Sequence, residues 1–296
     1  MSDDLKFLTI FTPTYNRAYL LPNVYSSLCE QKLACFEWVI VDDGSSDNTK
    51  ELVKQWISDK RIEIKFLEQT HGGKQKAHNK AVNYSRSTLF MCLDSDDILS
   101  PNAINGIFDL WKDADNGIAG IVGYKGLSLT EKIDIAIQKD IRKVCLVDLY
   151  NAGYKGETTL IYRTSILKEN LYPEIPGELY FVDSYVYERI DRKYKMLFLR
   201  NILQIYEYLP DGTSYNHLRT LQLNPLSYSA YYNQSIMYAN NISDKIFFCI
   251  YYIAHALLGK KRKIVIESNS PALSFLLYPL SVVYALILSF RYCFIK

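Results

Sequence analysis

Short apolar runs alternate with amphipathic segments along the first 115 residues of the chain. Nearly continuous or alternating apolar runs predict four strands, at residues 7–11, 39–41, 62–66 and 89–93. Apolar residues at helical spacing predict helices at about 20–28, 47–57, 74–87 and 103–111. The second of these helices is expected to bury Leu52, Val53, Trp56 and Ile57. Regular alternation of strand and helix indicates βαβ units and a parallel sheet.

The pattern changes beyond residue 115. Further strands are predicted at 117–124, 156–162, 195–199 and 202–208, and a helix at 181–193. The stretch between the first two of these strands fits no element, and helices dominate from about residue 225. We therefore expect an α/β domain over residues 1–222, with halves at 1–115 and 116–222, followed by a helical region at 223–296.

Composition fits a globular protein with a sizeable core. The 296 residues are 49% hydrophobic and 22% charged, which excludes wholesale disorder. A net charge of +2 gives no reason to expect a nucleic-acid partner. The six cysteines form no CxxC pair and the polar N-terminus is unlike a signal peptide, so we expect reduced thiols and a cytosolic domain.

A cluster of acidic residues follows the last apolar run of the first half, at Asp94-Ser95-Asp96-Asp97. Open α/β sheets place ligands just beyond the carboxyl ends of their strands. Two carboxylates at i and i+2 on an extended chain point the same way and repel each other, unless a cation lies between them. Oxygen ligands of this kind suit Mg²⁺ or Mn²⁺.

The alternative for this cluster is that one aspartate caps the following helix. Ser100 as N-cap and Pro101 at the first helical position are predicted to serve that start instead. The cluster therefore favours a metal site at this edge of the sheet.

Polar segments also follow the other strands. Residues 12–17 and 42–45 come after the first two apolar runs, and Gly72-Gly73-Lys74 opens a predicted helix. Carboxylates in the second segment are able to accept hydrogen bonds from a nucleobase N–H or a ribose hydroxyl. A glycine loop at a helix start is able to bring backbone amides to a diphosphate, although alone it also fits an ordinary turn. Together these segments predict a nucleotide-diphosphate ligand.

Three of these motifs resemble family 2 glycosyltransferases of GT-A fold. They are Thr12-Pro13-Thr14-Tyr15-Asn16-Arg17, Val41-Asp42-Asp43-Gly44-Ser45 and Leu93-Asp94-Ser95-Asp96-Asp97. The spacing of the motifs also matches, and the resemblance extends from residue 5 to about residue 220. It implies a Rossmann-like, mostly parallel sheet flanked by helices.

The resemblance also implies roles for particular residues. Pro13, Tyr15 and Asp43 would surround uracil, and Asp43 would accept from its N3–H. Asp94 would lie near the ribose or the metal, and Asp96 would ligate the metal. The complete expected nucleotide-sugar site consists of Thr12, Pro13, Tyr15, Arg17, Asp42, Asp43, Lys74, His78, Asn79, Asp94 and Ser95, with Asp94 and Asp96 as the Mn²⁺ or Mg²⁺ ligands.

Family members invert the anomeric centre and use a carboxylate on the acceptor side as general base. The segment Pro176-Gly177-Glu178-Leu179-Tyr180-Phe181-Val182-Asp183 resembles the one that supplies it. Asp183 aligns with the base, and Glu178 is the second candidate. A carboxylate within about 3 Å of the acceptor hydroxyl suits a single displacement of UDP. The other interpretation of Asp183 is a carboxylate that favours the dipole at a helix start.

The C-terminal region combines apolar helices with a basic cluster. Residues 245–258 are apolar but too short to span a bilayer, and Lys260-Lys261-Arg262-Lys263 follows them. Residues 268–290 carry no charge, but Pro271 and Pro279 interrupt them. We expect an in-plane or re-entrant helical hairpin on an anionic membrane surface rather than a spanning helix. The alternative is packing on the catalytic domain or a homodimer contact.

The combined prediction is an inverting, metal-dependent hexosyl- or N-acetylhexosaminyltransferase of the bacterial cytoplasmic membrane face. It would move a sugar from a UDP-sugar donor to a hydroxyl of a lipid-linked glycan, such as a capsule or exopolysaccharide precursor. One alternative is a polyprenyl-phosphate glycosyltransferase of the same fold. The other is a non-catalytic nucleotide-sugar-binding scaffold, against which the joint presence of Asp94, Asp96 and Asp183 argues.

Overall fold

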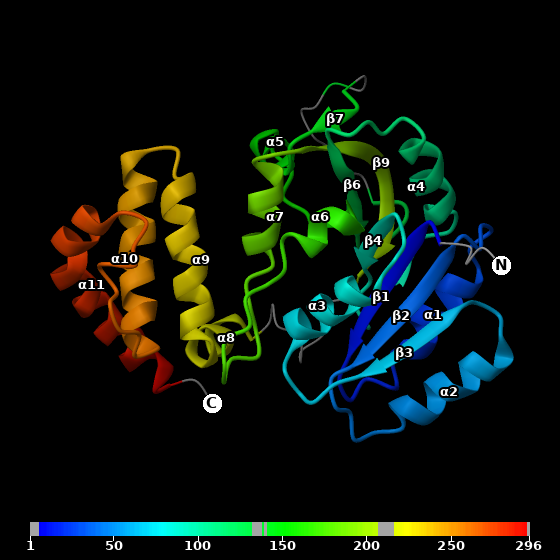
Figure 1. Cartoon of the computed structure of the whole chain (residues 1–296), viewed down its shortest axis with the longest axis horizontal. Coiled ribbons are helices and arrows are strands. Elements are labelled where there is room, and N and C mark those ends of the chain that lie inside the picture. The colour runs from blue at the N-terminus through cyan, green and yellow to red at the C-terminus, as the bar shows by residue number, and fades with distance from the viewer. Residues whose placement is uncertain (1–5, 132–137, 139–140, 207–215, 295–296) are drawn as a thin grey trace. The chain divides into compact units, whose positions relative to one another are not determined.

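The computed structural model describes residues 6–131, 138, 141–206 and 216–294 of the chain (Figure 1). Contacts within the chain group it into two compact units. The first comprises residues 1–171 and 186–207, and the second comprises residues 172–185 and 208–296. The predicted domain boundaries at residues 115 and 222 stay predictions.

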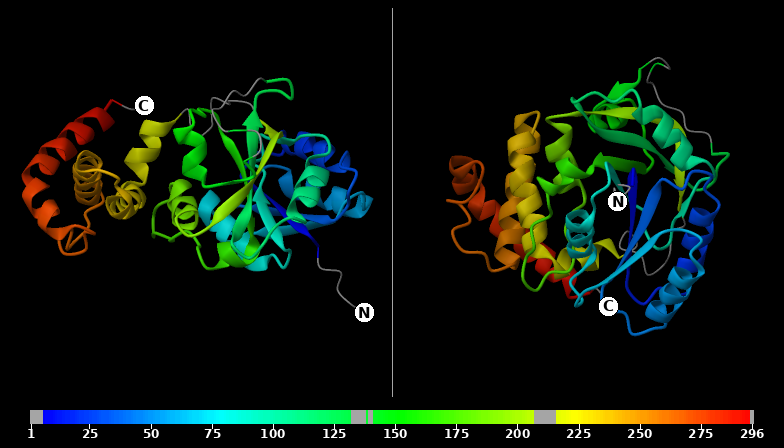
Figure 2. Two further views of the ribbon diagram at one scale, coloured as in Figure 1. Left: turned by 90° about the horizontal axis from the view of Figure 1, so that it is seen from above. Right: turned by 45° about the vertical axis from the view of Figure 1, so that its right-hand side comes forward.

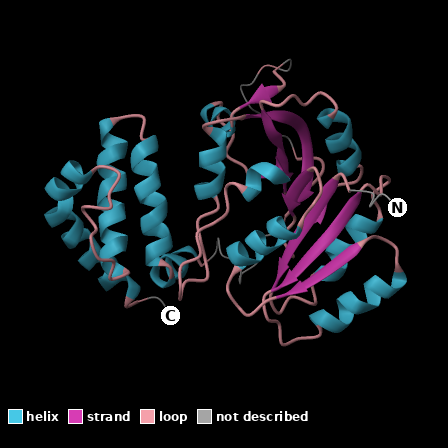
Figure 3. Cartoon of the chain, viewed as in Figure 1, coloured by secondary structure: helices cyan, strands magenta, loops and turns pink. Residues whose placement is uncertain are grey.

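The first unit is built on one mixed β-sheet with helices on both faces, as predicted (Figure 3). The strand order is β3-β2-β1-β4-β8-β6-β9-β5, and β7 pairs with β9. Parallel pairs join β3 to β2, β2 to β1, β1 to β4, and β6 to β9, and the other pairs are antiparallel. The strands span Leu8–Thr14 (β1), Phe36–Asp42 (β2), Ile64–Glu68 (β3), Leu89–Cys92 (β4), Ile98–Leu99 (β5), Ile118–Gly126 (β6), Lys143–Val144 (β7), Thr158–Arg163 (β8) and Lys195–Ile205 (β9).

Seven helices accompany this sheet along the described chain. They span Leu21–Cys29 (α1), Thr49–Asp59 (α2), Lys74–Tyr84 (α3), Ala103–Trp111 (α4), Leu146–Asn151 (α5), Thr164–Lys168 (α6) and Ser184–Asp191 (α7). Side chains of α1, α2 and α4 pack on one face of the sheet in a single hydrophobic cluster. α3 packs on the other face, where the His78 ring meets Phe11 and Phe90 edge-on.

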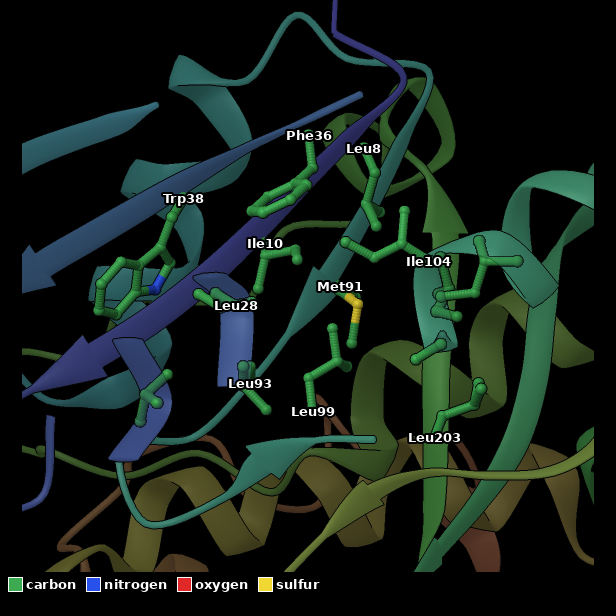
Figure 4. Packing of buried hydrophobic residues seen from close by; sticks show 14 of the residues in the cluster. Leu8, Ile10, Leu28, Phe36, Trp38, Met91, Leu93, Leu99, Ile104 and Leu203 are labelled. Carbon is green, nitrogen blue, oxygen red and sulfur yellow. The ribbon is translucent and has the colours of Figure 1, made fainter. Parts of the chain in front are cut away.

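β1, β2 and β4 all contribute side chains to the hydrophobic core. Every residue of β2 is buried, and Ile10 of β1 and Met91 of β4 are fully buried beside it (Figure 4). Strands buried on both faces read as near-continuous apolar runs, which is how the sequence shows them. Trp38 lies in this core, and its indole donates to Thr12 Oγ1 at 2.9 Å. Packing in this core therefore fixes where β1, β2 and β4 end relative to one another.

Three details of the first unit differ from prediction. α4 begins after Asn102, which has φ 60 and makes no capping hydrogen bond, so Ser100 and Pro101 do not form the predicted cap. Ile57 on α2 is exposed rather than buried. The strands predicted at 195–199 and 202–208 are joined in one continuous strand, β9, which ends at Ile205, and residues 207–208 lie outside the described part of the chain. An irregular register with β6 carries β9 through the polar residues between them.

The second unit is helical. Its helices span His217–Leu223 (α8), Pro225–Tyr238 (α9), Ile242–Leu258 (α10) and Pro271–Tyr292 (α11) (Figures 1 and 2). α10 packs against both α9 and α11. Within the described ranges, α11 is the one helix long and apolar enough to cross a bilayer, with a mean hydropathy of 2.0.

Gly120 is the position where the sheet tolerates no side chain. A Cβ added there would lie 1.8 Å from the carbonyl oxygen of Ile161 on the neighbouring strand. We expect Gly120→Ala to destabilise the protein by about 2–4 kcal/mol, because β6 and β8 would have to separate. Gly106→Ala in α4 is the matched control, since its Cβ would lie 3.4 Å from Leu199. Thermal melting of both variants tests this, and equal melting temperatures would contradict it.

Candidate nucleotide-sugar site

Three strand ends meet at one edge of the sheet, as the sequence predicted. β1 pairs in parallel with both β2 and β4, and the register sets Thr14 beside Asp42 and Phe11 beside Cys92. The polar segments 12–17, 42–45 and 94–97 leave the sheet at or near these positions. Their side chains therefore share one edge of the first unit, which is where open α/β sheets hold ligands.

Asp43 holds the glycine loop in place. Its carboxylate is buried and accepts hydrogen bonds from Gln69 Nε2 at 2.8 Å and from the amides of Gly72 and Gly73 at 2.8 and 2.9 Å. His71 Nδ1 lies 2.9 Å from the same carboxylate. A carboxylate offers about four lone-pair directions, so these contacts use its capacity. The predicted contact between Asp43 and a uracil N3–H stays a prediction.

Two glycines allow this loop to approach Asp43. Gly73 has φ 87 immediately before α3, and Gly44 has φ 86. A Cβ on Gly44 would also lie 3.3 Å from the backbone nitrogen of His71. Positive φ values of this kind are adopted readily by glycine alone. The glycines thus bring the backbone amides of the loop close to the edge of the sheet.

A second set of hydrogen bonds ties the loop after β1 to the loop after β2. Asp42 is buried and accepts from the Ser45 amide at 3.1 Å and from the Ser45 hydroxyl. The backbone amide of Asn16 donates to Ser45 Oγ at 2.8 Å, and the backbone amide of Ser46 donates to Asn16 Oδ1 at 2.7 Å. Asp42 therefore braces this edge from inside rather than offering its carboxylate to solvent.

Tyr15 presents an aromatic surface beside these loops. It is 44% exposed, and its ring stacks on that of His71 with centroids 4.2 Å apart and planes inclined by 22°. Pro13 is half-buried two residues earlier. Planar aromatic rings stack well on one another, so this pair is suited to a planar base. The sequence prediction included Tyr15 but missed His71, whose position three residues after β3 carried no helical or strand signal.

Asp94 and Asp96 are each matched by one cation. Lys74 Nζ lies 2.9 Å from both carboxylate oxygens of Asp94, and Arg17 Nη1 lies 2.9 Å from Asp96 Oδ2. Burial alone would raise the pKa of Asp94, but the charges of Lys74 and Lys125 lower it to about 2. Asp94 is therefore ionised at neutral pH. The structure brings together the predicted residues Arg17, Lys74, Asp94 and Asp96 at this edge.

Lys125 is a site residue that the sequence prediction missed. Its ammonium lies 2.8 Å from the buried carboxylate of Asp97 and 3.2 Å from Glu157. Burial raises the pKa of Asp97 to about 7; Asp94 adds to the shift and Lys125 opposes it. Lys125 lies in β6, and its positive charge within an otherwise apolar strand was the one sequence feature that could have pointed to it.

Several predicted residues are buried rather than facing solvent. His78 and Asn79 are 5% exposed, and Ser95 is 4% exposed. Thr12 is fully buried, and its hydroxyl oxygen accepts a hydrogen bond from the Trp38 indole. Burial, followed by the charge of Lys74, lowers the pKa of His78 to about 3, so its ring is neutral. These positions lie at the edge with the rest of the site, and their predicted contacts with a donor stay predictions.

The donor set of Asp94 and Asp96 fits a magnesium or manganese ion that also binds a ligand. Among the residues that the structure describes, no group of three or more His, Cys, Asp and Glu side chains forms a complete protein metal site. Mg²⁺ is commonly held by only one or two carboxylates together with substrate phosphates and water. Two carboxylates with exchangeable cation partners meet that requirement.

Glu178, the second base candidate, caps a helix in the second unit. Its Oε1 accepts from the Leu226 amide and its Oε2 from the Ser227 amide, both at 2.7 Å, at the start of α9. Asn224 Oδ1 in turn accepts from the Leu179 and Tyr180 amides at 2.9 Å. This reciprocal pair, which we call the 178/224 clasp, ties the segment before α7 to α9. Both oxygens of Glu178 are thus occupied by backbone amides.

Asp183, the first base candidate, immediately precedes α7 and belongs to the second unit. Its side chain is half-buried, and its backbone carbonyl accepts from the Tyr172 hydroxyl at 3.1 Å. Phe181 is buried next to it, which fixes the backbone at this point. The role of Asp183 as general base stays a prediction.

Sequence comparisons agree with this geometry. The profile of Glycosyl transferase family 2 matches residues 9–170. The poly(ribitol-phosphate) beta-N-acetylglucosaminyltransferase TarS of Staphylococcus aureus is 26% identical over 168 residues, which are 56% of this chain and 29% of TarS. A GalNAc(5)-diNAcBac-PP-undecaprenol beta-1,3-glucosyltransferase of Campylobacter jejuni is 27% identical over 173 residues, with 56% of this chain and 55% of the relative covered. The chain thus spans about a third to a half of the length of these relatives.

Solved structures of similar fold cover more of the chain. TarS residues 1–349 in complex with UDP-GlcNAc superpose with a TM-score of 0.55 at 17% identity, covering 89% of this chain and 76% of that one. The mannosyltransferase PcManGT of Pyrobaculum calidifontis, in complex with GDP-Man and Mn²⁺, gives a TM-score of 0.57 at 16% identity and covers 96% and 84% of the two chains. These likenesses establish the GT-A fold. Because the family profile matches more than half of its residues, the chain belongs to glycosyl transferase family 2.

Proposed function

We propose that the protein is an inverting glycosyltransferase that moves a hexosyl or N-acetylhexosaminyl group from a UDP-sugar to a hydroxyl of a lipid-linked bacterial surface glycan. The observation that carries the proposal is the set of carboxylate–cation pairs at one sheet edge: Asp94 with Lys74, Asp96 with Arg17 and Asp97 with Lys125. This edge therefore offers both the negative groups that bind a metal ion and the positive groups that bind a diphosphate. A nucleoside diphosphate bound there has cations for its phosphates and carboxylates for its metal.

The choice of UDP rests on the loops beside these pairs. The stacked Tyr15–His71 pair offers a surface for a pyrimidine ring, and Asp43 offers an acceptor for N3–H. A base that bonds to Asp43 would replace one of the side-chain donors on its carboxylate, while the amides of Gly72 and Gly73 keep the loop in place. The TarS fragment was crystallised with UDP-GlcNAc, which supports the same donor class here.

Asp94 and Asp96 would hold a Mn²⁺ or Mg²⁺ ion. When bound, such an ion offsets the negative charge that develops on the leaving diphosphate. Lys74 and Arg17 compete with the ion for the two carboxylates. Once the ion displaces them, Lys74 and Arg17 remain at the same sheet edge, where they are able to donate to a phosphate oxygen.

The transfer itself is a single displacement. The acceptor hydroxyl oxygen forms a bond to the anomeric carbon, and the bond from that carbon to the diphosphate breaks with its electron pair going to the phosphate oxygen. Asp183 takes the hydroxyl proton as general base. Glu178 serves as a structural residue, because backbone amides occupy both of its oxygens.

The names of two relatives support the proposed acceptor class. One is named for poly(ribitol-phosphate) and another for an undecaprenol-linked oligosaccharide, and both names describe bacterial envelope glycans or their precursors. A lipid-linked glycan would bring the acceptor hydroxyl to the membrane surface, where we place the enzyme on the cytoplasmic side.

The proposal predicts Mn²⁺-dependent turnover of a UDP-sugar that Asp96→Ala abolishes. Hydrolysis of a panel of UDP-sugars with Mn²⁺ identifies the donor. Loss of one metal ligand removes leaving-group stabilisation, so we expect the rate to fall by about 100- to 1000-fold. Asp109→Ala on the exposed side of α4 is the matched control and should keep full activity. Near-normal metal-dependent turnover by Asp96→Ala would refute the metal assignment.

Asp43→Ala should weaken UDP binding more than it slows turnover at saturating donor. Because Asp43 also holds the glycine loop, calorimetry should compare UDP with N3-methyl-UDP in both proteins. If Asp43 accepts from N3–H, methylation weakens binding to the natural protein by about 10- to 100-fold and has little effect on Asp43→Ala. An equal effect of methylation on both proteins would limit Asp43 to its structural role.

Asp183→Asn should keep donor binding and lose transfer by about 100- to 10,000-fold, since the amide cannot take a proton. Glu178→Gln should lower stability by about 1–2 kcal/mol through the 178/224 clasp and keep transfer in the folded protein. Transfer assays and thermal melting of both variants separate the two roles. An active Asp183→Asn together with an inactive, folded Glu178→Gln would reverse the assignment.

A further inference from the structure

α11 turns an apolar face outward, unlike the usual surface helix of a protein in water. The face that packs on the rest of the second unit mixes small residues with leucine and tyrosine, while the opposite face consists of large apolar side chains. The fully packed positions are Ser274, Ser281, Ala285, Leu288 and Tyr292. The outward stripe, each member between 49% and 75% exposed, consists of Phe275, Leu276, Leu280, Val283, Leu286, Ile287 and Phe290.

The outward stripe is continuous along the helix. Its members are two adjacent pairs and single residues spaced three or four positions apart, so they share one broad side of the helix along most of its length. A helix at a protein surface normally turns its polar side to water and its apolar side to the core. Small residues at helix–helix contacts with large apolar residues outside are instead typical of helices in lipid.

The serine hydroxyls on the packed face are bonded within the second unit. Ser281 Oγ donates to the Leu277 carbonyl at 2.9 Å, and the hydroxyls of Ser268 and Ser274 lie 2.6 Å apart. The sequence carries no charge between Glu267 and Arg291. The outward stripe of this described helix therefore has no side-chain hydrogen-bonding group to offer water or a protein partner.

The chain between α10 and α11 runs back along α10. The Lys261 amide donates to the Ala256 carbonyl at 2.8 Å, and the Tyr252 hydroxyl donates to the Ile264 carbonyl at 2.6 Å. Residues 259–270 thus retrace the last turns of α10, and both helices run downward in Figure 1. The predicted in-plane or re-entrant hairpin is wrong in one respect, because α10 and α11 run in the same direction and so form no hairpin.

This arrangement also argues against spanning. Leu273 packs in the cluster of Cys249, and Ala285 packs in the cluster of Ala254, so α11 lies along α10. If the pair crossed a bilayer, the polar chain of residues 259–270 would have to lie in the hydrocarbon region. Irregular, charged backbone exposed to lipid is not tolerated there. A helix lying flat on the surface avoids this cost.

Basic residues gather where both helices end. Lys260, Arg262 and Lys263 follow the end of α10 and are exposed, and Arg291 is exposed in the last turn of α11. Lys261 pairs with Glu267 at 3.2 Å. The cluster of Leu257 and Leu258 with Leu288 and Tyr292 places these helix ends together. A positive end beside an apolar stripe complements anionic head groups over acyl chains.

We propose that the outward stripe of α11 docks flat on an anionic bilayer, with the stripe in the outer acyl region and Lys260, Arg262, Lys263 and Arg291 among the head groups. A second copy of the chain is a poorer occupant, because protein interfaces of useful size carry hydrogen bonds that the stripe cannot supply. The inference does not depend on the transferase activity, so binding to vesicles tests it separately.

The first experiment is flotation of the full chain with phosphatidylcholine vesicles, with and without phosphatidylglycerol. We expect binding that requires the anionic lipid. Leu276→Gln/Leu286→Gln should weaken it by more than about tenfold, since two apolar side chains leave the stripe. Leu129→Gln is the control, because Leu129 is an exposed leucine of the first unit, outside the outward stripe. Neutralising Lys260 and Lys263 to glutamine should weaken binding by about fivefold per residue.

The second experiment measures how deeply positions along α11 enter the bilayer. Leu276→Trp, Val283→Trp and Phe290→Trp are tested one at a time with lipids brominated at different chain positions. A flat helix gives similar quenching depths at all three positions, whereas a spanning helix places Val283→Trp deepest. A protein that ignores all vesicles overturns the proposal, whether it is monomeric or forms a dimer that Leu276→Gln/Leu286→Gln dissociates. A spanning depth profile overturns the flat orientation.

Discussion

The crowding of carboxylates at the carboxyl ends of β1, β2 and β4 is the constraint on which the first unit depends. Asp42, Asp43, Asp94, Asp96 and Asp97 lie at one sheet edge, and three of them are largely buried. Buried carboxylates are costly unless hydrogen bonds or cations compensate them. The protein uses both solutions, and it uses them at different positions.

The two solutions separate structural from exchangeable groups. Asp42 and Asp43 are satisfied mainly by backbone amides and neighbouring polar side chains, which define the loops and cannot leave without unfolding them. Asp94 and Asp96 are satisfied by the flexible side chains of Lys74 and Arg17, which can move to another anion at small cost. The second pair is therefore the one suited to exchange its cation partners for a ligand, within a frame fixed by the first.

Much of the fold could be predicted from sequence because its central strands are buried on both faces. Continuous apolar runs marked β1, β2 and β4, and the acidic residues after them marked their ends. Local patterns were less informative where contacts between distant segments decide the structure. β7 has two residues and α5 has six, and both depend on pairing with β9 and capping by Asp191 rather than on their own periodicity.

The candidate site shows the same division. Arg17, Lys74, Asp94 and Asp96 could be named because motifs at strand ends carry them. Lys125 could not, since its partner Asp97 lies 28 positions away along the chain and only the sheet brings them within 2.8 Å. The capping role of Glu178 was missed for a similar reason, because α9 begins nearly fifty residues later.

Helical periodicity predicts a two-sided helix but does not say which side meets the rest of the protein. In α11 both sides carry large apolar side chains, and the packed side adds the small residues Ser274, Ser281 and Ala285. Serine and alanine let α11 approach α10 closely, and the serine hydroxyls bond locally instead of seeking water. Little apolar area is buried at the small residues themselves, so the hydrophobic gain of this contact comes mainly from side chains such as Leu273, Leu277 and Leu288. The outward stripe of α11 leaves large apolar side chains in contact with water, and an apolar phase beside it, as proposed above, would remove that exposure.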